Sequence, residues 1–155
     1  NVLNAVADRY DLPVIVSTHP RTKARLEKLN SKTHPQIQYL KPFGFFDYVH
    51  LQVHAKCVLS DSGTISEESA VMQFPAISIR TSTERPEAID SGTIVLGGIT
   101  KGEILNSIKI CLQTQNISVL KLPCEYEIKD VSSRVIRRIQ SYTNIINNVI
   151  NISKS

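Results

Sequence analysis

Short apolar runs alternate along the chain with segments in which apolar residues recur at helical spacing. Apolar runs of this length are typical of strands that are buried on both faces. The pattern predicts strands at residues 13–17, 37–40, 57–60, 75–79 and 93–96, and helices at 1–7, 21–29, 45–55, 65–73, 86–90, 100–114 and 131–150. Strands and helices that alternate in this way predict an α/β fold, in which helices cover both faces of a parallel sheet.

Capping signals mark the starts of two predicted helices. Thr100 followed by Glu103 forms a capping box for helix 100–114, and Thr64 followed by Glu67 repeats the pattern at helix 65–73. We interpret residues 116–130 as a linker in front of the long last helix.

Length and composition indicate a single globular domain. The chain has 155 residues, of which 41% are apolar, so it can bury a core of its own. No apolar run approaches the ~18 residues of a membrane span, and no basic-then-apolar leader opens the chain. Three widely spaced cysteines fit neither a disulfide framework nor a zinc knuckle, which favours the cytoplasm. Because Asn1 lies in a helical pattern without a cap before it, we expect residues 1–155 to be one domain of a longer protein.

The net charge of +4 raises the question of nucleic-acid binding. Basic residues gather at 21–32 and 134–138, but acidic residues lie in or near both stretches, and the sequence carries no nucleic-acid motif. Since a basic helix face is usually only solvated, we predict no nucleic-acid partner.

The junction between strand 57–60 and the following helix is the strongest candidate site. Ligands of parallel sheets bind beyond the carboxyl ends of the strands. Gly63 lets the backbone approach a ligand, and the hydroxyl of Ser62 and the first N–H groups of the helix suit a phosphate. The same residues make an ordinary helix N-cap, so this stretch by itself leaves both interpretations open. Glu68, one position beyond the capping Glu67, is placed to accept hydrogen bonds from a ribose diol.

Two further polar loops follow strands. Arg80 and Arg85 are suited to hold phosphate oxygens, or to pair with Glu84 or Glu87. His19 follows the first strand and can donate to a phosphate, although a lone loop histidine is more often structural.

Together these motifs resemble the C-terminal half of the non-hydrolysing UDP-N-acetylglucosamine 2-epimerases. The resemblance is carried by SDSGTISEE at 60–68, FP at 74–75, RTSTERPEA at 80–88 and GT at 92–93. It covers nearly the whole chain. Residues 80–83 and the tail 126–142 look closest to the branch that forms UDP-N-acetyl-L-fucosamine.

The resemblance implies one half of a GT-B fold, in which two Rossmann-like domains hold a sugar nucleotide between them. It implies the following UDP-binding residues: Ser62 and Gly63 at the diphosphate, Glu68 at the ribose, Tyr48 beside the uracil, Phe43 at the base edge, and Arg85 and His19 in the cleft.

The family reaction inverts C2 of a UDP-N-acetylhexosamine, UDP-GlcNAc to UDP-ManNAc, by elimination and re-addition of UDP. It implies no metal or redox cofactor. It also places the catalytic acid and base in an N-terminal domain, so we expect none in residues 1–155. The partners implied are a UDP-sugar, that domain and a second copy in a homodimer, within bacterial polysaccharide synthesis.

Several alternatives remain open or are set aside. A GT-B glycosyltransferase would use the same diphosphate junction, and a non-catalytic module would bind UDP without turnover. His50 and His54 have metal-ligand spacing but no third ligand nearby. Ser62 lacks the glycine two positions earlier that a hydrolase nucleophile elbow requires. Cys57 lies in a predicted strand core, and we expect it to be inert.

Overall fold

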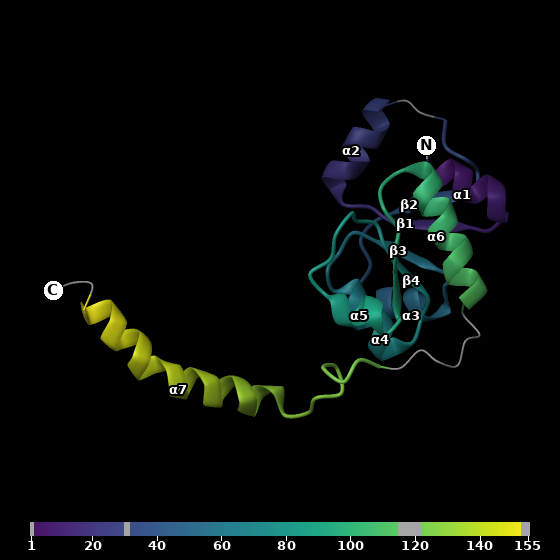
Figure 1. The fold of residues 1–155 in the computed structure, drawn as a ribbon. Coiled ribbons are helices and arrows are strands. Elements are labelled where there is room, and N and C mark those ends of the chain that lie inside the picture. The colour runs from purple at the N-terminus through teal and green to yellow at the C-terminus, as the bar shows by residue number, and fades with distance from the viewer. Residues whose placement is uncertain (1, 30–31, 115–121, 153–155) are drawn as a thin grey trace. The chain divides into compact units, whose positions relative to one another are not determined.

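The computed structural model describes residues 2–29, 32–114 and 122–152, which belong to two compact units. The first unit ends at Pro123, and the second begins at Cys124. The elements of the first unit (Figure 1) are α1 (Val2–Tyr10), β1 (Val14–Ser17), α2 (Pro20–Leu29), β2 (Ile37–Leu40), α3 (Phe45–His54), β3 (Val58–Ser60), α4 (Ile65–Met72), β4 (Ala76–Ser78), α5 (Pro86–Asp90), β5 (Ile94–Leu96) and α6 (Lys101–Thr114). Every strand and helix expected in this unit is present, with bounds that differ by a few residues at most.

All strand pairs of the first unit are parallel, as the pattern predicted, but they form two sheets. β1 pairs with β2, and β3, β4 and β5 form a second sheet in that order. The sequence pattern reports which runs are buried and not which strands share a ladder. It therefore could not show that β1 and β3 stand apart, with an apolar cavity between them.

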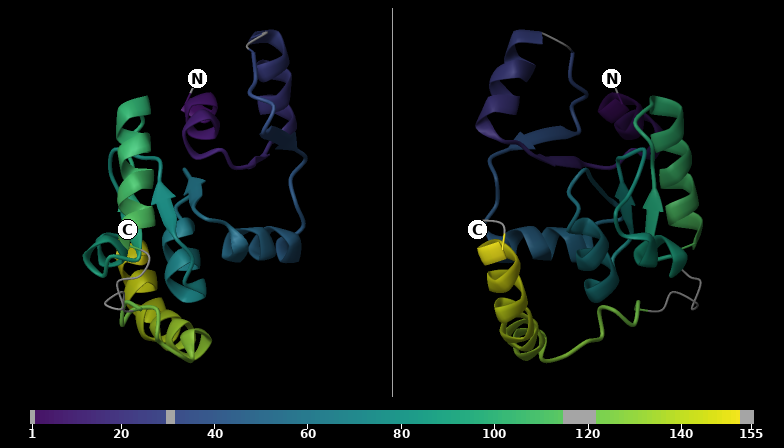
Figure 2. Two further views of the ribbon diagram at one scale, coloured as in Figure 1. Left: turned by 90° about the vertical axis from the view of Figure 1, so that its right-hand side faces the viewer. Right: turned by 60° about the vertical axis from the view of Figure 1, so that its left-hand side comes forward.

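Helices cover both faces of the three-stranded sheet, because side chains alternate along its strands. In β4, Ala76 joins the core formed with α4 and α5, whereas Ile77 joins the core formed with α6. Val58 and Leu59 divide in the same way in β3. In Figure 2, α6 runs beside the strands of this sheet. The predicted α/β architecture is confirmed.

One of the two predicted capping boxes is present. The Glu103 amide donates to the Thr100 hydroxyl at 3.3 Å, and the Thr100 amide donates to the Glu103 carboxylate at 2.8 Å. The box predicted at α4 was wrong: Thr64 has helical backbone angles and makes no capping bond with its side chain. Glu67 forms an ion pair with Arg85 instead.

The second unit contains α7 (Val131–Ile152), the predicted long last helix. Its apolar residues recur at helical spacing, so the helix is amphipathic. Among the helices of the described ranges, no segment combines the length and apolar character that crossing a bilayer would need.

Candidate functional site

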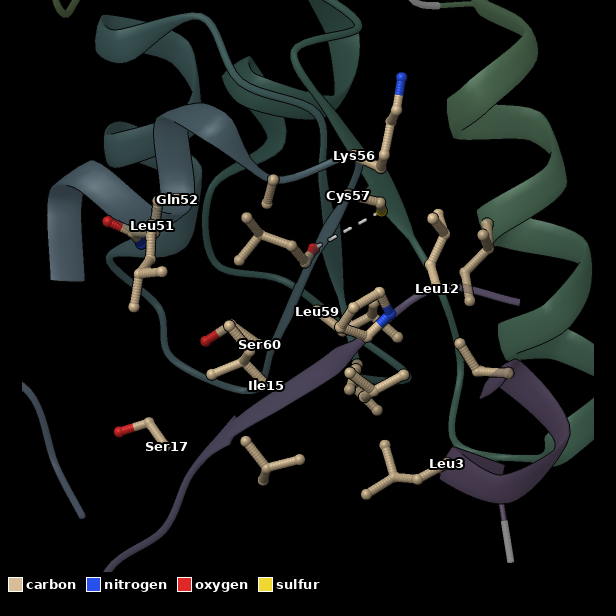
Figure 3. Close-up of a pocket in the computed structure, with 18 of the residues that line it drawn as sticks. Leu3, Leu12, Ile15, Ser17, Leu51, Gln52, Lys56, Cys57, Leu59 and Ser60 are labelled. Carbon is tan, nitrogen blue, oxygen red and sulfur yellow. Dashed lines mark hydrogen bonds between the residues drawn. The ribbon is translucent and has the colours of Figure 1, made fainter. Parts of the chain in front are cut away.

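A cavity of about 990 Å³ lies between β1 and β3 in the first unit (Figure 3). Its wall is mainly apolar, with Ile15 on β1 and Leu59 on β3 among its lining residues. At the carboxyl ends of the two strands the lining becomes polar, and Ser17, Ser60 and Ser62 belong to this end. The polar end of the cavity thus adjoins the turn that the sequence singled out.

Local hydrogen bonds shape the turn between β3 and α4. The Ser62 amide donates to the Ser60 hydroxyl at 3.1 Å, and the Thr64 amide donates to the Ser62 hydroxyl at 3.3 Å. The hydroxyls of Ser62 and Thr64 lie 2.9 Å apart. The amides of Ser62 and Thr64 are therefore engaged, whereas no described residue accepts from the amide of Gly63. The Gly63 amide is therefore available as a backbone donor to an anion at the N-terminus of α4.

Both arginines of the loop after β4 reach this turn. The Nε atom of Arg80 donates to the Asp61 carbonyl at 2.7 Å. The guanidinium of Arg85 lies over Gly63, where an added Cβ would be 3.0 Å from its Nη1 atom. Arg85 also forms an ion pair with Glu67, a partner that the sequence analysis did not foresee. Both side chains of this pair are part-exposed, so we assign it little stabilising energy. Its structural effect is to hold a cation beside the turn.

Glu68 is the centre of a second hydrogen-bonded group. The Nε2 atom of Gln52 donates to one carboxylate oxygen of Glu68 at 2.6 Å, and the Thr64 hydroxyl donates to the other at 2.8 Å. Burial raises the pKa of Tyr48, and the charges of Glu68 and Asp61 raise it further. Tyr48 therefore keeps its proton at neutral pH and can act as a donor near this carboxylate.

The remaining two site candidates lie in different settings. Phe43 lines the cavity together with Tyr48. His19 is not among the described residues that line it. Its Nδ1 atom accepts from the Arg21 amide at 3.2 Å, and its carbonyl accepts from the amides of the first turn of α2. The structure thus gives His19 a role at the start of α2 and leaves its contact with a ligand a prediction.

The histidine pair and the cysteine that were set aside have the following settings. The rings of His50 and His54 stack with centroids 4.2 Å apart, and no group of three potential metal ligands occurs among the described residues. The hydrogen bond with Cys111 raises the pKa of the Cys57 thiol, and burial raises it further. Cys57 is therefore a protonated thiol at neutral pH and a poor nucleophile.

Gln52, which is 3% exposed and bonded to Glu68, was not recognised from the sequence. A signal was present, because Gln52 lies four residues after Tyr48 on a predicted helix and therefore on the same face. The pairing of Glu67 with Arg85 was also not foreseen, because the two residues lie 18 positions apart in the sequence.

Comparisons with known proteins agree with the family resemblance of the sequence. A family model described as UDP-N-acetylglucosamine 2-epimerase matches residues 1–140. The UDP-N-acetylglucosamine 2-epimerase of Methanocaldococcus jannaschii is 34% identical over 111 residues, which are 69% of this chain and 30% of that protein.

Solved structures show the same correspondence. The UDP-N-acetylglucosamine 2-epimerase of Rickettsia bellii matches 98% of this chain and 42% of its own, with a TM-score of 0.84 and 36% identity. The M. jannaschii UDP-GlcNAc 2-epimerase in complex with UDP-GlcNAc and UDP matches 90% of this chain and 39% of its own, with a TM-score of 0.76 and 30% identity. The chain therefore spans less than half the length of these relatives.

Proposed function

Because this chain belongs to the UDP-N-acetylglucosamine 2-epimerase family, we propose that it is the nucleotide-binding part of an enzyme that inverts C2 of UDP-N-acetylglucosamine. The observation that carries the proposal is the convergence of Gly63, Arg85 and Glu68 at the N-terminus of α4. A cation, a backbone donor and a carboxylate at one turn match the diphosphate and the ribose of one nucleotide.

We propose that the diphosphate lies at the turn between β3 and α4. The Gly63 amide and the Arg85 guanidinium are its donors, and the Ser62 hydroxyl becomes a third when it turns from Thr64 to the ligand. When UDP leaves C1 of the sugar, negative charge grows on the diphosphate, and donors fixed at that place stabilise the charge. The ion pair with Glu67 limits the rotamers of Arg85 before the ligand arrives, which lowers the entropy cost of binding.

The nucleoside is assigned to the neighbouring residues. Glu68 accepts hydrogen bonds from the ribose diol, Tyr48 lies beside the uracil, and the backbone at Phe43 meets the base edge. Support comes from the proximity of Tyr48 to Glu68 and from the place of Tyr48 and Phe43 in one cavity lining. His19 is proposed as a cleft residue only through the family resemblance.

The acid and base at C2 are proposed to lie outside residues 1–155, so no catalytic residue is assigned in this chain. The enzyme as a whole is proposed to act in the cytoplasm, in bacterial polysaccharide synthesis, and to form a homodimer. The second candidate function is the formation of UDP-N-acetyl-L-fucosamine, which the sequence of residues 80–83 supports.

The test is to titrate the chain with UDP and, separately, with inorganic pyrophosphate, and to measure both affinities by NMR. Glu68→Ala should weaken UDP binding about tenfold, because hydrogen bonds to a charged group are lost. It should leave the affinity for pyrophosphate unchanged. Glu125→Ala, an exposed carboxylate of the second unit, is the matched control and should change neither. Equal UDP affinity in the wild type and Glu68→Ala would remove the ribose assignment, and C2 inversion by this chain alone would contradict the placement of the acid and base.

A further inference from the structure

Gln52 is a buried polar side chain that the proposed binding groups do not include. It lies on α3 with 3% of its surface exposed, and its Nε2 atom is 2.6 Å from a carboxylate oxygen of Glu68. Because an ionised carboxylate only accepts hydrogen bonds, this contact fixes which end of the amide faces Glu68. The other end, Oε1, is buried and has no hydrogen-bond partner among the described residues.

A buried amide with one unsatisfied end is a poor choice for packing alone. An unpaired buried carbonyl oxygen loses its hydration without compensation. Methionine has a similar length and volume and would fill the same space without that loss. Among the described residues, the Gln52 side chain makes its polar contact with Glu68, so this bond accounts for the amide at this position.

The two donors to Glu68 approach different oxygens. Gln52 bonds to Oε2 and the Thr64 hydroxyl bonds to Oε1, at 2.6 and 2.8 Å. A carboxylate has about four acceptor sites, so about two remain, one on each oxygen. Two acceptor sites on a carboxylate held from two sides fit the two vicinal hydroxyls of a ribose.

We infer that Gln52 is a positioning residue, which orients the Glu68 carboxylate so that it reads the 2′ and 3′ hydroxyls of the bound nucleotide. This inference rests on the proposed function, because it takes UDP as the ligand. Gln52 itself touches Glu68 and not the nucleotide. It deepens the proposed site by naming the group that makes the site selective for a ribose over a sugar without the diol.

The experiment compares two ligands, UDP and 2′,3′-dideoxyuridine 5′-diphosphate, by NMR titration of the chain. The wild type should bind UDP about tenfold more tightly than the dideoxy ligand, since one or two bonds to a charged acceptor are lost. In Gln52→Met that ratio should fall toward one through weaker UDP binding, while the affinity for the dideoxy ligand stays the same. In Glu68→Ala the ratio of the two affinities should likewise fall toward one. Adding Gln52→Met to Glu68→Ala should weaken UDP binding no further.

Stability separates positioning from packing. Gln52→Met should unfold at the same or a higher denaturant concentration than the wild type, because the unsatisfied carbonyl is gone. Gln38→Met, at an exposed glutamine of β2, is the control and should keep the wild-type ratio. Thr64→Val removes the other donor at an exposed position and should also lower the ratio, which provides a measurement independent of core packing.

The possible results distinguish the two proposals. A wild-type chain that does not bind UDP would overturn the proposed function and this inference with it. A wild type that prefers UDP, together with a Gln52→Met variant that keeps the full preference, would overturn this inference alone. If Gln52→Met lost affinity for both ligands equally and was less stable, Gln52 would have a packing role, and this inference would again be overturned.

Discussion

The close approach of Arg85 to Gly63 gives a prediction about how the guanidinium serves the diphosphate. In Gly63→Ala the new Cβ would lie 3.0 Å from Nη1 of Arg85, whereas atoms in contact prefer about 3.5–4.0 Å. The guanidinium must therefore move by a few tenths of an ångström away from the turn. Gly63 does not have a positive φ angle, so alanine adds no backbone strain there.

The expected effect on affinity is larger than the effect on stability. Loss of one hydrogen bond between Arg85 and a phosphate costs about 1.5–3 kcal/mol, or about 10- to 150-fold in affinity. The ion pair with Glu67 is part-exposed and contributes about 1 kcal/mol at most, and alanine recovers a similar amount by restricting the unfolded chain. Gly63→Ala should thus bind UDP much more weakly and unfold at nearly the wild-type temperature.

A double-mutant cycle with Arg85→Ala tests whether Gly63→Ala weakens UDP binding by displacing the Arg85 guanidinium. UDP affinity is measured for the wild type, Gly63→Ala, Arg85→Ala and the double variant by calorimetric titration. If the new methyl group acts by displacing the guanidinium, it should cost little once Arg85 is absent. Gly102→Ala is the control, since its added Cβ meets nothing within 4 Å and should leave UDP binding intact. Full UDP affinity in Gly63→Ala, or an equal loss in both backgrounds, would refute the reasoning.

Two further predictions concern stability. Ile77→Ala should lower the free energy of unfolding by about 2–5 kcal/mol in chemical denaturation, because Ile77 is fully buried. The control Val71→Ala, on an exposed face of α4, should change that free energy by about 0.5 kcal/mol at most. Equal changes in the two variants would contradict the assigned core. Hydrogen bonds from Thr100 and Ile99 lower the pKa of Glu103, so its stabilising contribution is complete above the unfolded pKa of about 4.3 and is lost as the pH falls through the folded pKa. The difference in melting temperature between the wild type and Glu103→Ala should therefore shrink from pH 7 toward pH 3, and a constant difference would argue against the capping box.

Local sequence patterns determined the elements of this protein and the place of its candidate site. Alternation in β4, with Ala76 and Ile77 on opposite faces, is a property of neighbouring residues and can be recognised without a fold. The capping box of Thr100 and Glu103 spans a single turn, so its two bonds could also be foreseen. The turn at Gly63 was recognisable for the same reason, since a strand, a small polar turn and a helix follow each other directly.

Only the tertiary structure decided which side chains from separate elements meet. Glu67 carries a local capping pattern, yet it pairs with Arg85 from the loop after β4, because packing of α4 and α5 brings the two together. Gln52 reaches Glu68 from another helix, and the separation of β1 from β3 depends on how the two sheets pack. A sequence specifies periodicity over a few residues, whereas contacts between distant segments depend on the summed packing of the whole unit, which no short pattern contains.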